Sequence, residues 1–114
     1  RTKDLMEKGI EDLSNVRDEV ENMHLKDKSA TFNTARIEAL EMQNLFEVAE
    51  ATAVTANSRK ESRGAHSRDD YPDRDDENWL KHSIYFSETK EVSKRDVNYR
   101  PKTVQAFQPT VRSY

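Results

Sequence analysis

The sequence contains no cysteine, only two glycines and three prolines, and no long apolar run. Without cysteine the chain can form no disulfide, no thiolate metal site and no cysteine nucleophile, a composition that fits a reducing compartment. No stretch approaches the roughly 20 apolar residues that cross a bilayer, and the amino terminus lacks the apolar core of a signal peptide. We therefore expect a soluble chain with no direct membrane span.

Large apolar residues are also scarce. Leu, Ile, Val and Phe make up about 18% of the 114 residues, below the roughly 20% at which disorder becomes an alternative. The formal net charge of -3 is too small for the self-repulsion of a disordered acidic chain. A chain of this length is close to the usual size of one domain. We expect a single domain that depends on a larger body for part of its core.

The charge is unevenly distributed. Residues 90–114 carry six basic and two acidic side chains, so the acidic excess lies in residues 1–89. Aromatic residues are not interleaved with these basic ones in the way that a base-stacking surface requires. We therefore expect no nucleic-acid partner.

Two long helices are predicted for the first half of the chain. Within residues 3–24, apolar side chains recur every three or four positions and charged ones occupy the opposite face, with Thr2 available as a cap. Residues 33–60 contain no glycine or proline, and Ser29, Thr31 or Asn33 is placed to cap this second helix. The apolar positions of the first stripe are Met6, Ile10, Leu13, Val16, Val20 and Met23.

The second helix is apolar on more than one side, so it needs at least two neighbours, whereas the first helix can cover only one face. Something else should pack there. The alanines of residues 49–56 are consistent with a close helix approach, and equally with the high helix propensity of alanine.

Gly64 is predicted to close the second helix as a left-handed carboxy-terminal cap. Basic residues in the last turn would then complement the helix dipole; these are Arg59, Lys60 and Arg63. Pro72 excludes a regular helix over residues 66–75. A short helical turn is expected at residues 75–81, capped by Asp75 or Asp76, followed by strands at 82–86 and 92–99 and an extended tail.

His66 has two interpretations. With Arg63 and Arg68 on either side and Asp69 and Asp70 following, the imidazole could take part in proton transfer. The favoured alternative is a network of hydrogen bonds and ion pairs that fixes a loop broken by Gly64. The remaining histidines are spaced unlike a metal triad.

The acidic residues between positions 69 and 77 suggest a calcium loop, but the pattern fails. A loop that starts at Asp73 would need glycine at its sixth position and a carboxylate at its twelfth, where Asn78 and Ile84 stand. Trp79, the only tryptophan, could be a ligand platform, but an anchor that covers the helix ends is favoured.

Several segments resemble the carboxy-terminal region of the succinate dehydrogenase flavoprotein family. They are residues 44–45, 51–54, 56–57, 61–68 (ESRGAHSR), 72–82 (PDRDDENWLKH) and the closing 111–114 (VRSY). The SRGAH motif is shared with fumarate reductase and is similar in L-aspartate oxidase, whereas the PDRDDENW run and the terminal residues favour a bacterial succinate dehydrogenase.

The resemblance implies a parent enzyme that oxidises succinate to fumarate on covalently held FAD and passes electrons through an iron-sulfur subunit to quinone at the cytoplasmic face of the bacterial inner membrane. The flavin and substrate residues of this family lie in preceding domains, so we expect no catalytic, cofactor-binding or metal residue here. The partners would be the flavin-binding part of the same subunit and the iron-sulfur subunit.

The expected fold is mainly α: a helical hairpin from an incomplete three-helix, spectrin-repeat-like bundle (1–65), then an appendage with a loop, a short β-hairpin and a tail (66–114). Arg1-Thr2 resembles the junction after the first helix of that bundle. We therefore expect an open apolar groove that leads the isolated chain to self-associate or to remain partly disordered.

A structural network between the helical part, the appendage and the flavin domain is predicted at Arg63, Gly64, His66, Arg68, Arg74, Asp75 and Trp79. The alternatives are the same scaffold in a fumarate reductase, and an autonomous helical interaction module with a basic tail.

Overall fold

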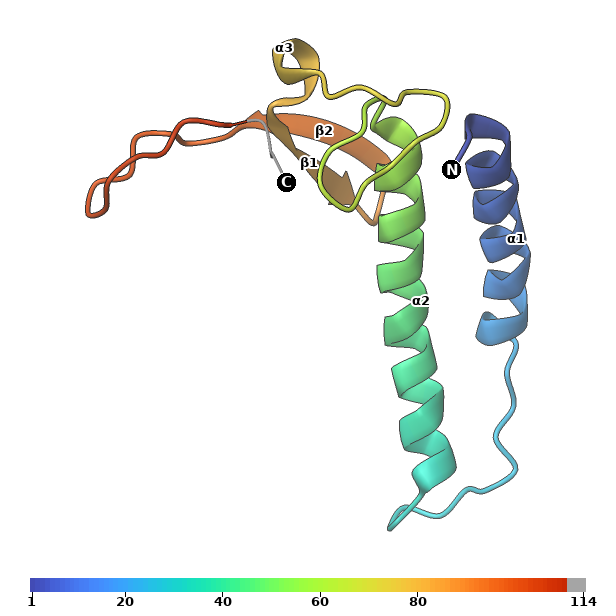
Figure 1. Cartoon of the computed structure of the whole chain (residues 1–114). Helices are drawn as coiled ribbons and strands as arrows, with labels where there is room; N and C mark the ends of the chain where they lie inside the picture. The colour runs from blue at the N-terminus through green and yellow to red at the C-terminus, as the bar shows by residue number, and fades with distance from the viewer. Residues whose placement is uncertain (111–114) are drawn as a thin grey trace.

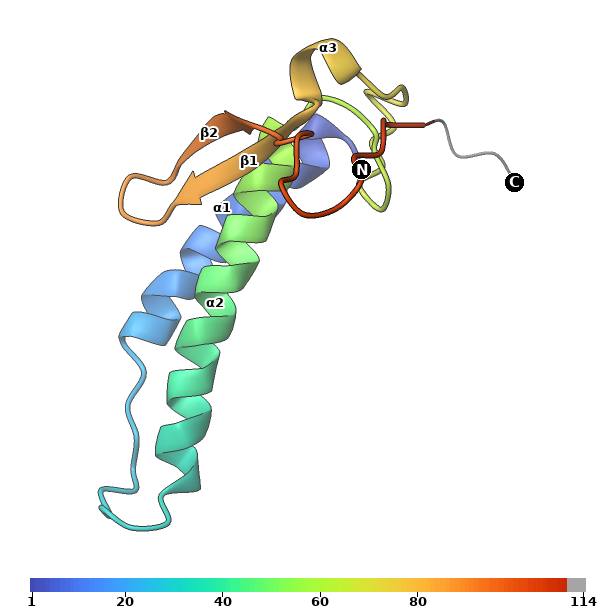
Figure 2. The ribbon, with the colours of Figure 1, turned by 90° about the vertical axis from the view of Figure 1, so that its left-hand side faces the viewer.

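The computed structural model describes residues 1–110 as a helical hairpin, a loop with a short helix, and a two-stranded β-hairpin. Helices α1 (Lys3–Glu21) and α2 (Thr34–Ser58) run antiparallel side by side (Figure 1). The short helix α3 (Asp76–Trp79) and strands β1 (Lys81–Phe86) and β2 (Glu91–Asp96) gather at the carboxy-terminal end of α2 (Figure 2). This confirms the predicted fold class. The predicted match at residues 111–114 lies outside the described residues.

Helix α1 ends at Glu21, so the prediction that it reaches residue 24 is wrong. The amide of Asn22 donates to the Asp18 carbonyl, and Asn22 is no longer helical. Thr2 occupies the amino-terminal cap position, but its side chain makes no capping bond. Instead the Asp70 carboxylate accepts from the Lys3 amide at 3.0 Å. A loop residue thus caps the start of α1.

Helix α2 begins after Asn33, whose side-chain oxygen accepts from the Arg36 amide at 2.8 Å. Of the three predicted caps, Asn33 is therefore the one used. The helix ends at Ser58 because Arg59 already has an extended backbone. Placing Arg59 and its basic neighbours in the last helical turn was wrong. Gly64 does have a left-handed backbone (φ 59), but it lies in the turn between Arg63 and His66 rather than at the helix end.

The β-hairpin is antiparallel, with Lys81 opposite Asp96 and Phe86 opposite Glu91. The predicted second strand extends too far, because pairing stops at Asp96. Strand β1 begins at Lys81, because the residues before it form α3 and its cap Asp75. The chain beyond Asp96 therefore has no strand residue opposite it. The short helix ends at Trp79, two residues earlier than predicted.

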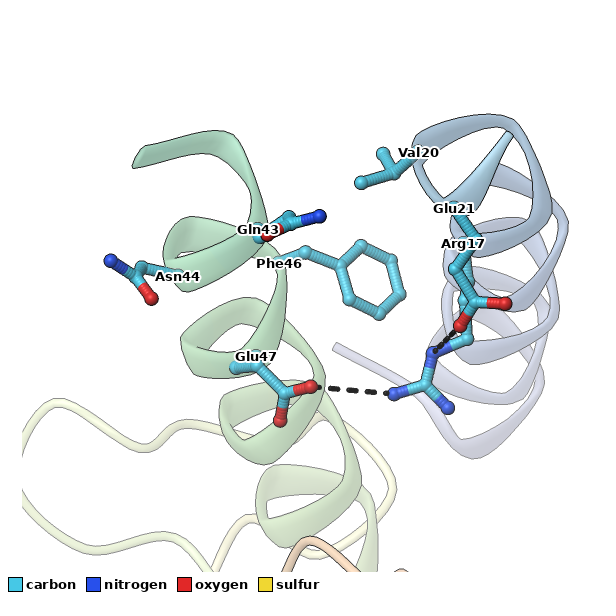
Figure 3. Close-up of a pocket in the computed structure, with 7 residues that line it drawn as sticks. All are labelled: Arg17, Val20, Glu21, Gln43, Asn44, Phe46 and Glu47. Atoms are coloured by element: carbon cyan, nitrogen blue, oxygen red, sulfur yellow. Dashed lines mark ion pairs between the residues drawn. The ribbon is translucent and has the colours of Figure 1, made fainter. Parts of the chain in front are cut away.

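The interior of the described chain is polar to an unusual degree. Phe46 is its only buried apolar residue, at 8% exposed. It points from α2 toward α1 beside a cavity of about 250 Å³, with the Arg17 guanidinium 5.2 Å from the ring centre (Figure 3). The other buried residues are Asn33, Glu50, Glu61 and Arg68.

An apolar groove runs along the helical hairpin. A cavity of about 660 Å³ lies between α1 and the second half of α2. The two helices therefore cover each other on one side only. The apolar residues that line the groove include Leu5, Met6, Leu13, Ala49, Ala53 and Ala56.

Candidate functional site

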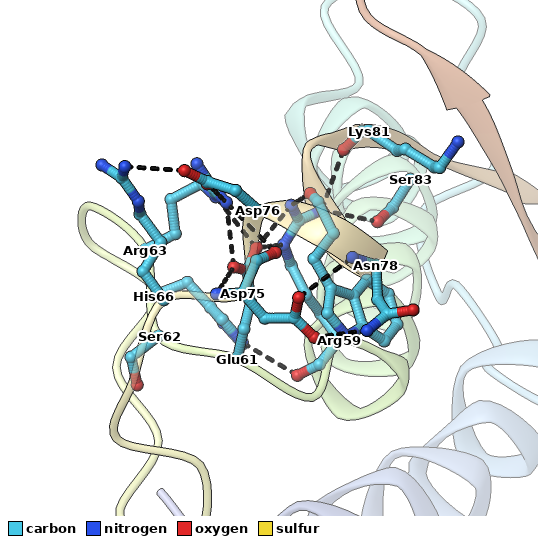
Figure 4. A network of polar contacts seen from close by, with 12 residues as sticks. Arg59, Glu61, Ser62, Arg63, His66, Asp75, Asp76, Asn78, Lys81 and Ser83 are labelled. Carbon is cyan, nitrogen blue, oxygen red and sulfur yellow. Dashed lines mark hydrogen bonds and ion pairs between the residues drawn. The ribbon is translucent and has the colours of Figure 1, made fainter. Parts of the chain in front are cut away.

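The buried carboxylate of Glu61 is the centre of a polar network at the end of α2. Its side chain is 0% exposed, and Arg63 binds it in bidentate fashion, with Nε 2.9 Å from Oε1 and Nη2 3.0 Å from Oε2. Arg59 Nε donates to Oε1 at 2.8 Å, and the Asp75 amide donates to Oε2 at 2.9 Å (Figure 4). Every side of this carboxylate is thus occupied by a donor. We call these residues, together with Asp76, the Glu61 network.

Arg59 connects the Glu61 network to the β-hairpin and the short helix. Its Nη1 donates to the Lys81 carbonyl and to the Ser83 hydroxyl, both at 3.1 Å, and its Nη2 donates to the Trp79 carbonyl. The same guanidinium lies 5.5 Å from the centre of the Trp79 ring. One side chain therefore ties the end of α2 to α3 and β1, which explains why the chain leaves the helix at Ser58.

The outer edge of the network is formed by Asp76, which accepts from Arg63 at 2.5 Å and from Arg74 at 2.7 Å. Arg74 also donates to the Thr110 carbonyl at 3.0 Å. Arg74 thus reaches the tail but touches Glu61 only through Asp76.

The electrostatics of the network keep Glu61 ionised. Burial by itself would raise the pKa of this carboxyl, but hydrogen bonds from Arg63, the Asp75 amide and Arg59 outweigh it and lower the pKa below its ordinary value. The hydrogen bond to Glu61 in turn raises the pKa of Arg63 despite its partial burial. A buried charge is tolerated here because it is fully hydrogen-bonded.

A second cluster surrounds Arg68, which is only 2% exposed. Its guanidinium binds Asp70 through two hydrogen bonds of 2.9 and 2.6 Å, and it also donates to the Asn57 carbonyl at 2.8 Å and the Arg59 carbonyl at 3.2 Å. The Arg68 hydrogen bonds lower the pKa of Asp70 to about 2. Since Asp70 also caps α1 at the Lys3 amide, this cluster joins both long helices to the loop.

His66 lies beside both clusters. Its Nε2 is 3.2 Å from the Arg59 carbonyl, and because a carbonyl only accepts, Nε2 carries the hydrogen. Its backbone exchanges two hydrogen bonds with Arg63 across the turn at Gly64. These contacts hold the turn at Gly64 against the end of α2, and the role of His66 in a structural network stays a prediction.

Trp79 is half-buried and serves as a platform for two cations. Lys94 Nζ lies 3.4 Å from the ring centre, in addition to the Arg59 contact. The ring therefore contacts cations from both β2 and the end of α2. Among residues 1–110, no group of three acidic or histidine side chains is placed to hold a metal ion.

A third charged cluster lies farther along α2. Glu50, 4% exposed, accepts from Arg17 at 3.0 Å, from the Tyr85 hydroxyl at 3.1 Å and from Lys90 at 2.9 Å. Burial would raise the pKa of Glu50, but the hydrogen bonds from Lys90 and Tyr85 and the charge of Arg17 bring it below its ordinary value. This carboxylate joins α1, α2 and the hairpin.

The predicted site residues are brought together in part. Arg63 and Asp75 belong to the Glu61 network, and Trp79 contacts it through Arg59. Gly64 and His66 form the adjacent turn, whereas Arg68 belongs to its own cluster and Arg74 lies at the edge. The prediction missed four central residues. They are Arg59, Glu61, Asp70 and Asp76.

One sequence signal could have identified Glu61. It has an arginine two positions before it and another two positions after it, so a single carboxylate is flanked by two cations in the loop. In the described residues the acids of these clusters are paired with cations or amides. The arrangement is chemically suited to holding elements together.

Comparisons with known proteins find relatives that match all or nearly all of this chain. The family model "Fumarate reductase flavoprotein C-term" matches residues 1–114. The succinate dehydrogenase flavoprotein subunit of Coxiella burnetii is 50% identical over 112 residues, covering 98% of this chain, and the fumarate reductase flavoprotein subunit of Haemophilus influenzae is 34% identical over 109 residues, covering 96%.

A solved E. coli quinol fumarate reductase chain superposes with a TM-score of 0.79 at 34% identity over 95% of this chain. The present chain spans about a fifth of the length of these relatives: 19% of the Coxiella subunit, 18% of the Haemophilus subunit and 19% of the solved chain.

Proposed function

The chain belongs to the family of carboxy-terminal domains of succinate dehydrogenase and fumarate reductase flavoproteins, and on this premise we propose that it is the structural carboxy-terminal part of a succinate dehydrogenase flavoprotein subunit. The observation that carries the proposal is the match over residues 1–114, with 50% identity to a succinate dehydrogenase flavoprotein subunit. The 34% identity to a fumarate reductase subunit makes the reverse direction the second candidate.

The parent subunit would oxidise succinate to fumarate on FAD, and this chain would contribute no reacting group. FAD does not fit the described residues. A dinucleotide cradle needs closely spaced glycines at the start of a helix, whereas Gly9 lies inside α1 and Gly64 lies in an isolated turn. The flavin and the substrate would be bound by other parts of the polypeptide.

The role of this chain would be to fix one face of the subunit. The Glu61 network and the Arg68 cluster join α1, α2, α3 and the β-hairpin into one block through short, charge-assisted hydrogen bonds. Such a block can present a defined surface to the flavin-binding part of the subunit. This is the structural role that we propose for the predicted residues Arg63 to Trp79.

The apolar groove would hold a further helix of the same subunit. It is lined by small and apolar residues of α1 and α2, and its volume of about 660 Å³ is open along the helices. Leu45 and Val48 of α2 are also 69% and 64% exposed. Exposed apolar surface of this extent is characteristic of a face that is covered in the complete protein.

The remaining partners would be those of the parent complex: an iron-sulfur subunit that accepts the electrons, and through it a membrane quinone. We propose a peripheral position at the cytoplasmic face of a bacterial inner membrane. No helix of residues 1–110 is long and apolar enough to cross a bilayer.

The proposal is tested by purifying the natural polypeptide that contains this sequence. We expect a chain several times longer than 114 residues that retains flavin and reduces an electron-acceptor dye when succinate is added. The 114-residue chain alone should retain no flavin and show no such activity. A natural polypeptide without flavin, or flavin and succinate oxidation in the 114-residue chain alone, would contradict the proposal.

A further inference from the structure

Phe32 occupies an unusual position at the tip of the helical hairpin. It lies directly before the Asn33 cap of α2, its side chain is 96% exposed, and its backbone is left-handed with φ 53. A left-handed backbone is unfavourable for a bulky residue, and an exposed aromatic ring gains nothing from water. We therefore expect a contact of the ring that offsets the cost of the strained backbone and of its exposure to water.

Lys90 shows what such a compensation looks like. It is the other residue of the described chain that is not glycine and has positive φ, at 57. Its left-handed backbone lies in the hairpin turn, and its Nζ reaches the buried Glu50 carboxylate at 2.9 Å. The backbone strain at Lys90 is offset by a contact within the chain. At Phe32 an exposed fraction of 96% leaves almost no surface for one.

The loop that carries Phe32 is held firmly in place. The Asn33 side chain donates to the Asp27 carbonyl at 3.1 Å and to the Ser29 carbonyl at 3.0 Å, and it accepts from the Arg36 amide. Asp27 in turn accepts from the Ser29 amide at 2.8 Å. Asn33 itself is buried. The ring is thus presented by a preorganised loop.

The surroundings of the ring indicate what it would bind. Ile37 and Leu40, on the first turns of α2, are 57% and 52% exposed, so the usual packing of the residue before the cap against the first turn is not made. The flanking charges are mixed: Lys26, Lys28 and Arg36 are basic, and Asp27 and Glu38 are acidic. The tip is an apolar patch with a border of mixed charge.

We propose that Phe32 is an anchor that inserts into an apolar pocket on the part of the same polypeptide that lies outside this chain. The inference rests on the proposed function, because the relatives are about five times as long as this chain and so provide the body on which the tip docks. A protein pocket suits one rigidly held aromatic ring.

The first test compares two substitutions in the full-length subunit. Phe32→Asn relieves the backbone strain, since asparagine tolerates the left-handed region, but removes the ring. Phe32→Leu keeps the strained backbone and a large apolar side chain. We expect Phe32→Asn to lower the Tm by a few degrees and Phe32→Leu to lower it by less. If the ring faces water, Phe32→Asn would instead raise the Tm or leave it unchanged, and this result overturns the proposal, as does an equal fall for Phe32→Leu.

The second test locates the pocket by replacing Phe32 with photoreactive p-benzoylphenylalanine in the full-length subunit, with the exposed neighbour Thr31 replaced as the matched control. We expect position 32 to cross-link to one peptide of the same polypeptide that contains apolar residues. Cross-links to lipid, to another polypeptide or to nothing, or the same scattered products as from position 31, would overturn the proposal. The mass of the intact subunit tests the proposed function separately, because a polypeptide no longer than this chain would refute the parent enzyme itself.

Discussion

The two ends of α2 differ in the kind of side chain that they bury and expose. At its carboxy-terminal end the chain buries charged side chains, Glu61 at 0% and Arg68 at 2% exposed, and connects each of them to several partners. Toward its amino-terminal end the same helix leaves apolar side chains such as Leu45 in solvent. The carboxy-terminal end is complete within the chain, whereas the rest of the helical hairpin is covered on one side only.

This difference separates interactions that a short stretch of chain can complete by itself from those that need a large neighbouring surface. A buried carboxylate needs a few donors in defined directions, and residues 59–76 supply them within a short stretch of chain. An apolar helix face must be covered by a large apolar surface, and α1 together with the β-hairpin cannot provide enough of it. We expect the two regions to respond differently to perturbation.

Acid should have the largest effect, because it neutralises the paired carboxylates of all three clusters together. The pKa of Asp70 is about 2 in the folded chain and those of Glu61 and Glu50 are lowered. The stability that their pairing provides is complete above a pH of about 4.5 and is lost as the pH falls toward about 2. Trp79 fluorescence should change in this window before the far-UV circular dichroism of the helices. A simultaneous loss would mean that the two regions form one cooperative unit.

Removal of the central carboxylate should come next. Glu61→Ala leaves the half-buried Arg59 and Arg63 without their shared partner, and we expect it to lower the free energy of unfolding by about 3 kcal/mol. Urea denaturation followed by Trp79 fluorescence measures the change. Glu88→Ala, in the exposed hairpin turn, is the matched control and should change stability by no more than about 0.5 kcal/mol. An equal effect of the two substitutions would contradict the importance of the Glu61 network.

The helical hairpin can be tested at its one buried apolar residue. Phe46→Ala should lower the free energy of unfolding by about 3 kcal/mol, the lower end of the range for a buried phenylalanine, because a cavity already adjoins the ring. Val48→Ala, at a position 64% exposed on the same helix, should have little effect. Circular dichroism during denaturation measures both. A similar loss at Val48 would show that this face of α2 is already covered.

The smallest effects concern the two glycines. Gly64→Ala meets no atom within 4 Å, so its cost is the left-handed backbone alone (φ 59), about 1–2 kcal/mol. Gly9→Ala, also free of contacts but inside α1, should stabilise the 114-residue chain by about 0.5–1 kcal/mol. Thermal denaturation of the two variants should therefore show shifts of opposite sign. A rise in Tm for Gly64→Ala would mean that the turn can adopt another conformation.

Much of the fold could be predicted from local patterns. The apolar stripe around Ile10 and Leu13 predicted α1, and the absence of glycine and proline over residues 33–60 predicted α2. Its breadth predicted that one neighbour would not cover it. The boundaries failed where a distant contact decides them. Arg59 leaves α2 because β1 and Trp79 accept its hydrogen bonds, and no local pattern contains that information.

The sequence predicted a polar network around His66 but not the residue at its centre. The dense charges around His66 indicated a network, but they did not show that Glu61 is its most buried member. The division of the chain at residues 65 and 66 stays a prediction, as does the role of Arg74 and its neighbours between domains. In the structure Arg59 and Glu61 on one side of that boundary bind residues on the other.

By itself the sequence determined two amphipathic helices, a hairpin, a charged loop and, through the resemblance carried by residues 61–68 and 72–82, the family. These follow from spacing and local chemistry, which one stretch of chain contains. Only the tertiary structure decided that Asp70 caps α1, that Glu61 is shared by two arginines, and that Phe32 is presented in solvent with a left-handed backbone. Each of these depends on which distant groups meet, because burial and hydrogen-bond partners are properties of the packed chain.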